Sequence, residues 1–187
     1  MKQIAVFCGS SAGNAREYTD AAIALGTALA RQSITLVYGG GKVGLMGQIA
    51  DACLAAGGRA TGIMPEALVA REIFHPDLSE LKIVPDMATR KARMSDLSDG
   101  FIAMPEDAGT LEEITEQWVW GQLGLHAKPV AFFNVNGFYD PLMGFIDQMV
   151  EHAFLQHQFR EMLICSDTVE TLLEGMRAYQ PPKMKWT

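Results

Sequence analysis

Short apolar runs that do not alternate with polar residues are the feature that most constrains this chain. They lie at 4–8 (IAVFC), 34–38 (ITLVY), 59–64 (RATGIM), 100–104 (GFIAM) and 129–133 (PVAFF). A strand with one face in water alternates in polarity, whereas a strand covered on both faces reads as a continuous apolar run. The runs therefore predict strands buried on both faces of a sheet, and LKIVP at 81–85 is a candidate for a further strand.

Helical patterns separate these runs. They cover about 15–32, 44–56, 87–97, 110–123 and 139–154, and a closing helix over 167–179 would start at Asp167 or Thr168. Strands that alternate with helices in long crossovers are typical of parallel sheets. We expect an α/β fold: a Rossmann-like, doubly wound, mostly parallel sheet with helices on both faces.

The size and charge of the chain limit its organisation and its partners. With 187 residues and 49% hydrophobic content, it can bury one substantial core and is short for two domains. We expect a single domain over 1–187, with a tail from about 180 to 187 that is flexible or docked on the surface. The net charge of -7 argues against binding to nucleic acid or to an anionic membrane, which require basic surfaces. Small molecules and other proteins are the expected partners.

The cysteines point to no special chemistry. Cys8, Cys53 and Cys165 lie far apart, without the paired spacing of a zinc site or a disulfide framework. We therefore expect no metal site. The start of the chain lacks the pattern of a signal peptide, and no apolar stretch reaches the ~18 to 20 residues of a membrane span. A cytoplasmic location is the expectation.

The loops that follow the strands are where a ligand should bind, because parallel α/β sheets bind ligands beyond the carboxyl ends of their strands. After the first run comes CGSSAGN, in which Gly9 permits a tight turn and Ser10 offers a hydroxyl near a helix start. This arrangement suits an anion. An ordinary turn capped by Ser or Asn explains it equally well.

A glycine-rich loop follows the second run. In YGGGKVGLMG, Gly39, Gly41 and Gly44 satisfy the G-x-G-x-x-G spacing. A nicotinamide fingerprint should follow the first strand and have an acid about 20 residues later, but this loop follows the second and finds Arg59 there. A mononucleotide or sugar-phosphate site is the better interpretation, and close packing of helix on strand is the alternative.

A basic cluster interrupts an otherwise acidic sequence. MATRKARM at 87–94 places Arg90, Lys91 and Arg93 in one helical stretch. A solvated basic face is the usual explanation for such a cluster. Its position before the fourth run also makes Arg90 a candidate clamp for an anion or a carboxylate, because a guanidinium can bind both oxygens at once.

Two acids stand in the loop after the fourth run, MPEDAGTLEE at 104–113. Thr110 and Glu113 have the T-x-x-E spacing of a capping box, in which each side chain satisfies a free amide at a helix start. Glu106 and Asp107 would be stabilised by the helix dipole, by ~0.3 to 1 kcal/mol each. These local roles compete with a role in ligand binding.

Taken together, the motifs resemble one known family. VFCGSSAGN, LVYGGGKVGLMG, RKARM, GTLEE and WGQLGLHAKPVAFFNVNGFYDPL, which span nearly the whole chain, are similar to the cytokinin riboside 5'-monophosphate phosphoribohydrolases. These are the Lonely guy or LOG proteins, many once labelled lysine decarboxylases. The resemblance implies hydrolysis of the bond between an N6-substituted adenine and ribose 5-phosphate, with no metal or organic cofactor, by a homodimer.

The resemblance also implies roles for individual residues. Arg90 and Glu113 would be the catalytic pair. Glu72, in AREIF, matches an acid that contacts substrate. The resemblance implies that Glu72, Lys91, Gly109, Thr110 and Glu112 bind the substrate. We add Gly9, Ser10, Gly40 and Gly41 from the loops after the first and second runs to the candidate substrate-binding residues.

The chain departs from the family signature P-G-G-x-G-T-x-x-E where Glu106 and Asp107 replace the paired glycines. Elsewhere Ala88 stands where the family usually has His, and Val119 where it commonly has Thr. Carboxylates that faced a phosphate would oppose its binding. They could instead turn outward, pair with the basic cluster, or mark a chain that no longer takes the ordinary substrate. The alternative functions are accordingly a non-catalytic or repurposed nucleotide-binding homodimer, and a purine-nucleotide hydrolase with a different base preference.

Overall fold

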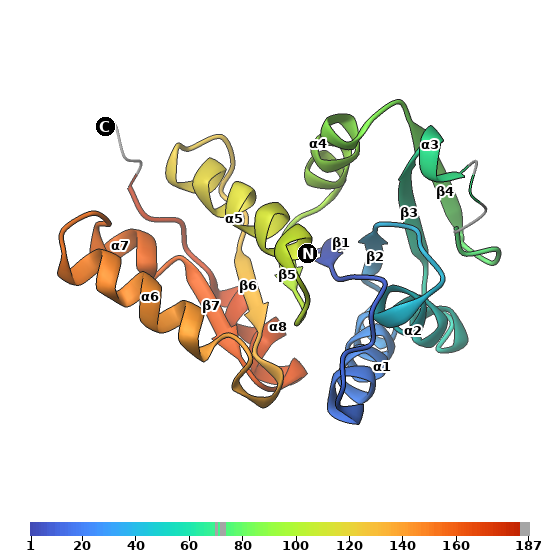
Figure 1. Ribbon diagram of the computed structural model, residues 1–187, viewed down its shortest axis with the longest axis horizontal. Helices are drawn as coiled ribbons and strands as arrows, with labels where there is room; N and C mark the ends of the chain where they lie inside the picture. Colours follow the sequence, from blue (N-terminus) through green and yellow to red (C-terminus); the bar gives the residue numbers. More distant parts are fainter. Residues whose placement is uncertain (70, 72–73, 184–187) are drawn as a thin grey trace.

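The computed structural model describes residues 1–69, 71 and 74–183. Its centre is a seven-stranded sheet in the order β4-β3-β2-β1-β5-β6-β7 (Figure 1), and every pair of neighbouring strands is parallel. The strands are β1 (Gln3–Phe7), β2 (Thr35–Tyr38), β3 (Ala60–Pro65), β4 (Glu80–Val84), β5 (Phe101–Ala103), β6 (Val130–Phe133) and β7 (Leu163–Ser166). The predicted α/β class and doubly wound sheet are confirmed.

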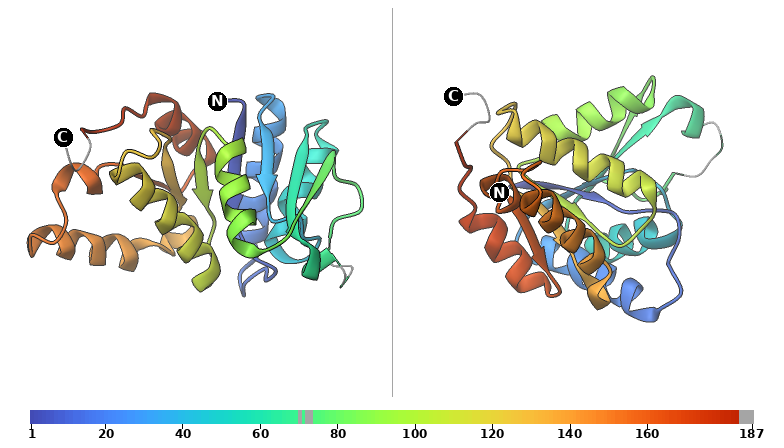
Figure 2. Two further views of the ribbon diagram at one scale, coloured as in Figure 1. Left: turned by 90° about the horizontal axis from the view of Figure 1, so that it is seen from above. Right: turned by 60° about the vertical axis from the view of Figure 1, so that its left-hand side comes forward.

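Helices lie on both faces of this sheet (Figure 2). They are α1 (Arg16–Arg31), α2 (Gly44–Ala55), α3 (Glu66–Val69), α4 (Met87–Leu97), α5 (Ala108–Gln122), α6 (Asp140–Glu151), α7 (His157–Arg160) and α8 (Val169–Ala178), with a short 3-10 helix η1 (Val135–Gly137) before α6. Among the residues described, none of these helices has both the length and the hydropathy needed to cross a bilayer.

Each strand divides its side chains between two cores. In β1, Ile4 and Val6 pack with the core under α1, α2 and α8. Ala5 and Phe7 face the other way, into the core under α4, α5, α6 and α7. Because both faces are covered, apolar residues occupy successive positions, which is why the runs in the sequence do not alternate.

The strand order reverses at β1. From β1 the chain moves outward through β2 and β3 to β4, and it then returns to the other side of β1 with β5. Ala5 pairs with Val37 on one side and with Phe101 on the other. The loops after β1 and β5 therefore leave the same sheet edge in opposite directions, and a crevice at such a reversal is the usual ligand site of this architecture.

The element boundaries agree with expectation except at a few places. The run at 81–85 forms β4, whereas β7 was not predicted: it is an edge strand, LICS, with partly exposed side chains and too few apolar residues to stand out. The closing helix is capped by Thr168, whose side chain accepts from the Thr171 amide, rather than by Asp167. α6 ends earlier than expected, because Ala153 adopts a positive φ of 60° just beyond it.

Candidate active site

A buried ion pair lies beyond the carboxyl ends of the central strands. Arg90 of α4 donates from Nη1 to Oε1 of Glu113 in α5 over 2.9 Å. The two side chains are only 12% and 10% exposed. The structure therefore brings together the two residues proposed as a catalytic pair, which are 23 positions apart in the sequence.

The surrounding backbone orients the Arg90 guanidinium. The start of α4 is capped by Asp86, whose Oδ1 accepts from the Thr89 amide over 2.7 Å. Nε of Arg90 donates to the carbonyl oxygen of Ile63 in β3 over 3.1 Å. On its other side the guanidinium lies against Gly39, where an added Cβ would come within 2.2 Å of Nη2. A glycine is needed there for the close approach of the arginine.

The electrostatics of the pair are set by opposing effects on Glu113. Burial raises the pKa of Glu113 above its usual range, the positive charge of Arg90 lowers it, and the nearby carboxylates of Glu112 and Glu106 raise it further. The pKa of Cys8, at the end of β1, is also raised, by burial and then by Glu113 and Glu106. Glu113 is therefore a carboxyl group with increased proton affinity beside a fixed cation, as a general base requires.

The loop after β5 does not contain the predicted capping box. The N-cap of α5 is Asp107, whose Oδ1 accepts from the Gly109 amide over 2.9 Å, so the helix begins before Thr110. Thr110 lies within the first turn and donates its hydroxyl to another side chain, and Glu113 pairs with Arg90. The T-x-x-E prediction is wrong because an Asp three positions earlier already caps the helix.

Glu106 turns inward, toward the β1 loop. Its Oε2 accepts from the Thr110 hydroxyl over 3.0 Å, and Thr110 is 2% exposed. Its Oε1 lies only 1.5 Å from the position of a Cβ added to Gly9. In the described part of the chain, neither Glu106 nor Asp107 forms an ion pair with the basic cluster. The two side chains thus point in different directions: Asp107 caps α5, and Glu106 fills the space between the loops that follow β1 and β5.

The glycine-rich loop after β2 is held mainly by local contacts. Gly40 has a positive φ of 83° and its carbonyl accepts from the His75 amide over 2.8 Å. Gly41 forms an isolated bridge with Phe74, and its carbonyl accepts from the Tyr38 hydroxyl over 3.2 Å. These contacts favour the packing interpretation for Gly40 and Gly41, while Gly39 contributes by accommodating Arg90.

The loop after β1 rests on the start of α2. The Met46 amide donates to the Gly9 carbonyl over 3.1 Å. Gly44 has a φ of 61°, and a Cβ there would lie 2.2 Å from the backbone carbon of Ser10. Ser10 itself is exposed at the sheet edge, so its hydroxyl is available to a ligand.

Two other proposed binding residues hold α4 to α5. Lys91 forms ion pairs with Glu112 and, over 3.1 Å, with Glu116. The hydrogen bond that Lys91 donates to the Glu112 carboxylate is the main reason that the pKa of Lys91 is raised. Lys91 and Glu112 thus contact each other, in a brace beside the Arg90–Glu113 pair. The remaining proposed residue, Glu72, lies outside the described residues.

An apolar cavity of about 250 Å³ adjoins Glu106 and was not predicted. Its lining includes Tyr18, Pro105 and Phe138 beside the two acids of the loop. Tyr139 supports it from below: its hydroxyl donates to the Met104 carbonyl over 2.6 Å, and its ring packs edge-on against Phe138. The aromatic residues of GFYDP follow β6 at the same sheet edge, so the strand-end rule could have selected them.

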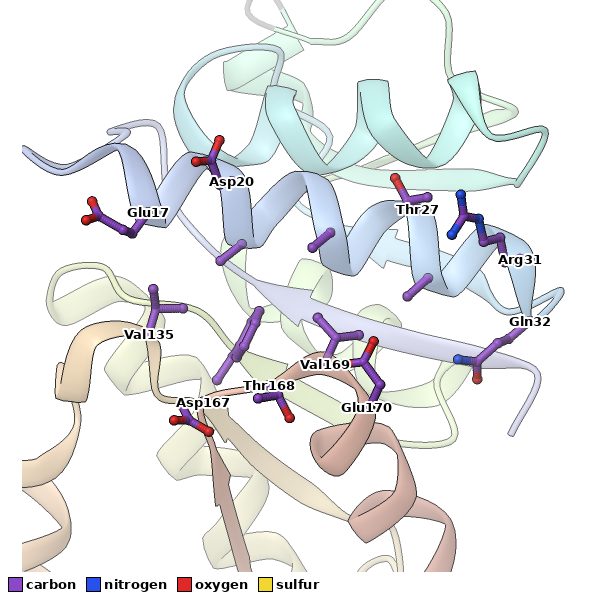
Figure 3. Close-up of a pocket in the computed structure, with 14 residues that line it drawn as sticks. Glu17, Asp20, Thr27, Arg31, Gln32, Val135, Asp167, Thr168, Val169 and Glu170 are labelled. Carbon is purple, nitrogen blue, oxygen red and sulfur yellow. The ribbon is translucent and has the colours of Figure 1, made fainter.

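A larger cavity of about 700 Å³ lies elsewhere, between α1 and the start of α8 (Figure 3). Its rim carries Glu17, Asp20, Asp167 and Glu170, with Arg31 at one end. Since α1 and α8 cover the sheet face opposite to α4 and α5, this cavity is separated from the Arg90–Glu113 pair. Its size alone does not make it the active site.

Comparisons with known proteins identify close relatives. The model of a family described as possible lysine decarboxylase matches residues 46–176. A rice protein, probable cytokinin riboside 5'-monophosphate phosphoribohydrolase LOGL6 of Oryza sativa subsp. japonica, is 46% identical over 99% of this chain and 76% of its own. Cytokinin riboside 5'-monophosphate phosphoribohydrolase LOG1 of Arabidopsis thaliana is 47% identical over 96% of this chain and 84% of its own.

Solved structures share the architecture at much lower identity. The molybdenum cofactor binding protein of Rippkaea orientalis has a TM-score of 0.72 and 18% identity, covering 95% of this chain and 96% of its own. The molybdenum cofactor carrier protein of Chlamydomonas reinhardtii has a TM-score of 0.72 and 16% identity, covering 95% and 97%. At these identities the likeness concerns the fold alone.

Proposed function

Because the chain belongs to the family of the cytokinin riboside 5'-monophosphate phosphoribohydrolases, we propose that it releases the cytokinin base from its riboside 5'-monophosphate by hydrolysis. The products are the free base and ribose 5-phosphate. The observation that carries this assignment to residues is the buried Arg90–Glu113 pair at the strand reversal.

Glu113 is proposed to stabilise the positive charge that develops on the ribose and to activate the attacking water molecule. As the bond between C1' of the ribose and the base nitrogen breaks, positive charge develops on the ribose, and a nearby carboxylate lowers the energy of that charge. The same carboxylate can take a proton from a water molecule, whose oxygen bonds to C1' as the bond to the base nitrogen breaks. The base takes up one proton from the solvent and Glu113 returns its own, so that one water is consumed in total. Burial of Glu113 supports this role, because a raised pKa makes it a better proton acceptor.

Arg90 is proposed to keep that carboxylate ionised and fixed in direction. Its hydrogen bonds to Ile63 and Glu113 are made by Nε and Nη1, so the guanidinium is held in place while Nη2 lies against Gly39. Such pre-organisation is effective in a buried site, where the dielectric constant is low.

The 5'-phosphate is proposed to bind at the start of α5. Helix N-termini favour anions, and here the Glu106 side chain reaches from Thr110 at the start of α5 to the space beside Gly9 in the β1 loop. Gly9, Ser10, Gly109 and Thr110 are proposed to line the phosphate site. The other residues implied by the family resemblance are proposed to contribute around this centre, Lys91 and Glu112 through the brace between α4 and α5. The remaining ones are Gly40, Gly41 and Glu72.

The assignment is tested by incubating the protein with isopentenyl-AMP and AMP and measuring free base and ribose 5-phosphate. Glu113→Gln should lower kcat by roughly 100-fold to 10,000-fold, because the amide cannot accept the proton. Glu174→Gln, an exposed acid of α8, is the matched control and should retain the wild-type rate. An undiminished rate in Glu113→Gln would refute the catalytic role of this residue.

We further propose that the chain forms a homodimer through the outer side of α5. Leu111, Val119 and Leu123 are 37%, 45% and 41% exposed, and Leu125 just beyond the helix is 67% exposed. Apolar side chains that gather on one surface commonly mark an interface. Light scattering coupled to size exclusion should give a molar mass about twice the 20.4 kDa of the chain.

A further inference from the structure

The carboxylate of Glu106 stands where the proposed function requires the phosphate of the substrate. It accepts the Thr110 hydroxyl over 3.0 Å at the start of α5. It also occupies the space beside Gly9, with Oε1 at 1.5 Å from the position of an added Cβ. The carboxylate of Glu106 thus already lies between the loops that follow β1 and β5.

A carboxylate and a phosphate compete for the same partners. Both accept hydrogen bonds from hydroxyls, and both are stabilised at a helix N-terminus. They cannot lie together, because like charges at contact distance repel and both groups need the same volume. A nucleotide that binds between Gly9 and Thr110 must therefore displace the side chain of Glu106.

The structure provides room for that displacement. Glu106 is half-buried and lines the apolar cavity of about 250 Å³ that Tyr18 and Phe138 help to form. Because the side chain already borders this cavity, we take the cavity side as the direction in which the carboxylate moves when a nucleotide binds. Asp107 has no such freedom, because its side chain caps α5.

We propose that Glu106 is a specificity-determining residue that competes with the 5'-phosphate of the substrate and so weakens the binding of nucleotides relative to the corresponding ribosides. The proposal rests on the proposed function for the position of the phosphate. A riboside has a 5'-hydroxyl in place of the phosphate and can bind while Glu106 remains bonded to Thr110. The chain should therefore discriminate less between nucleotide and riboside than it would with a small residue at this position.

Three variants separate charge, volume and position. Glu106→Gln keeps the size of the side chain and removes its charge, whereas Glu106→Ala removes both. Asp107→Asn is the matched control: it makes the same change in net charge one residue away and keeps a side chain that can cap α5. Circular dichroism and the melting temperature establish that each variant folds.

The first measurement is the binding of inorganic phosphate by calorimetry, which does not depend on turnover. Glu106→Gln should bind phosphate roughly tenfold more tightly than wild type, and Glu106→Ala more tightly still. Asp107→Asn, which also removes a charge at the start of α5 but leaves Glu106 in place, should give a clearly smaller gain. The second measurement compares kinetics on AMP and adenosine. The KM for AMP should fall in both Glu106 variants, with kcat and the KM for adenosine nearly unchanged.

The outcomes distinguish this proposal from the proposed function. Unchanged or weaker phosphate binding in folded Glu106→Gln would overturn the competition, and so would an equal gain in Asp107→Asn, which would indicate only a general effect of charge. An equal fall in KM for AMP and adenosine would also contradict it. If no nucleotide is turned over but phosphate binds more tightly to the Glu106 variants, the proposed reaction fails while the competition holds.

Discussion

Arg90 is held on three sides, by Ile63, by Glu113 and by Gly39. Its guanidinium leaves the carboxylate of Glu113 with less proton affinity than burial alone would give it. At the scale of single residues, the proposed role of Glu113 therefore rests on a balance between desolvation of this acid and the charge of Arg90.

The pH profile should reveal this balance. Replacing Arg90 by Gln removes the positive charge that lowers the pKa of Glu113, so this pKa should rise. Because the proposed base acts in its ionised form, the acidic limb of kcat/KM should move to higher pH and the maximal rate should fall.

The measurement is kcat/KM for the nucleotide across the pH range in which the variant stays folded. Arg93→Gln, an exposed basic residue of the same helix, is the control and should leave the midpoint of the acidic limb in place. A midpoint in Arg90→Gln that does not move would show that Glu113 does not sense this cation.

A methyl group at Gly39 should displace the arginine. The added Cβ would lie 2.2 Å from Nη2 of Arg90, and because this is the end of a flexible side chain, the guanidinium should shift and leave the fold intact. A displacement of about 1 Å can cost on the order of 100-fold in rate. We expect Gly39→Ala to lose roughly 10-fold to 100-fold in kcat with a melting temperature within a few degrees of wild type.

Gly144→Ala provides the comparison for this experiment, because nothing lies within 4 Å of the added Cβ and the position is inside α6. It should keep full activity. Equal kinetics in the two alanine variants would mean that Gly39 does not set the position of Arg90.

At the scale of elements, the start of α5 combines a structural cap with the proposed site. Asp107 accepts from the Gly109 amide, and its exposed carboxylate contributes to the helix through that bond. Glu106, its neighbour, has no capping role and instead bridges to the β1 loop. Two adjacent acids that read alike in the sequence thus perform different tasks.

Removing the N-cap of α5 should lower the free energy of unfolding, whereas a replacement that can still cap the helix should leave it nearly unchanged. Asp107→Ala should lower the free energy of unfolding by ~0.5 to 2 kcal/mol, whereas Asp107→Asn should stay within a few tenths. For a domain of this size a loss of ~1 kcal/mol corresponds to a fall in melting temperature of roughly 2 to 4 °C. Urea denaturation of the three proteins measures the difference, and equal midpoints for Ala and Asn would contradict the capping role.

Lys91 forms ion pairs with Glu112 and Glu116, a contact that the sequence motifs did not predict. The basic cluster predicted residues for binding an anion, and the family resemblance placed Lys91 among them. In the structure its amine is occupied by two carboxylates of α5. The sequence could not reveal this pairing, because it depends on how α4 and α5 pack across the sheet.

For the whole molecule, the exposed side of α5 should decide the state of association. Val119→Glu combined with Leu123→Glu would place two charges in the proposed interface, where they could not be hydrated. We expect the molar mass by light scattering to fall from dimer to monomer. Phe145→Glu, at a site of α6 that is 55% exposed, is the control and should leave the mass unchanged. A monomeric wild type would refute the dimer.

Periodicity in the sequence was enough to predict the class of fold and most of its elements. It could not predict the order β4-β3-β2-β1-β5-β6-β7, since alternating strands and helices are compatible with several arrangements. β7 went unrecognised because a short edge strand buries little apolar surface.

The site shows the same limit. Arg90 and Glu113 were matched through the family resemblance, but their contact could be established only when the helices were placed in space. The direction of the Glu106 side chain could not be predicted for a similar reason. It depends on the hydrogen bond from Thr110 and on the space that Gly9 leaves by having no side chain, and both arise only when the loops are placed in space. The start of α5 was predicted at Thr110 instead of Ala108 because the sequence offers two possible N-caps, Asp107 and Thr110, and Asp107 is the one that caps the helix.

The central position of β1 has a consequence for biosynthesis. One neighbour of β1, the strand β2, is synthesised soon after it, whereas the other, Phe101–Ala103 in β5, leaves the ribosome long afterwards. At translation speeds of ~5 to 20 residues per second, that hydrogen-bonding edge stays open for on the order of 5 to 20 s. A nascent chain stalled before β5 would expose the unpaired backbone N–H and C=O groups of β1, which could pair with other chains unless a chaperone covered them.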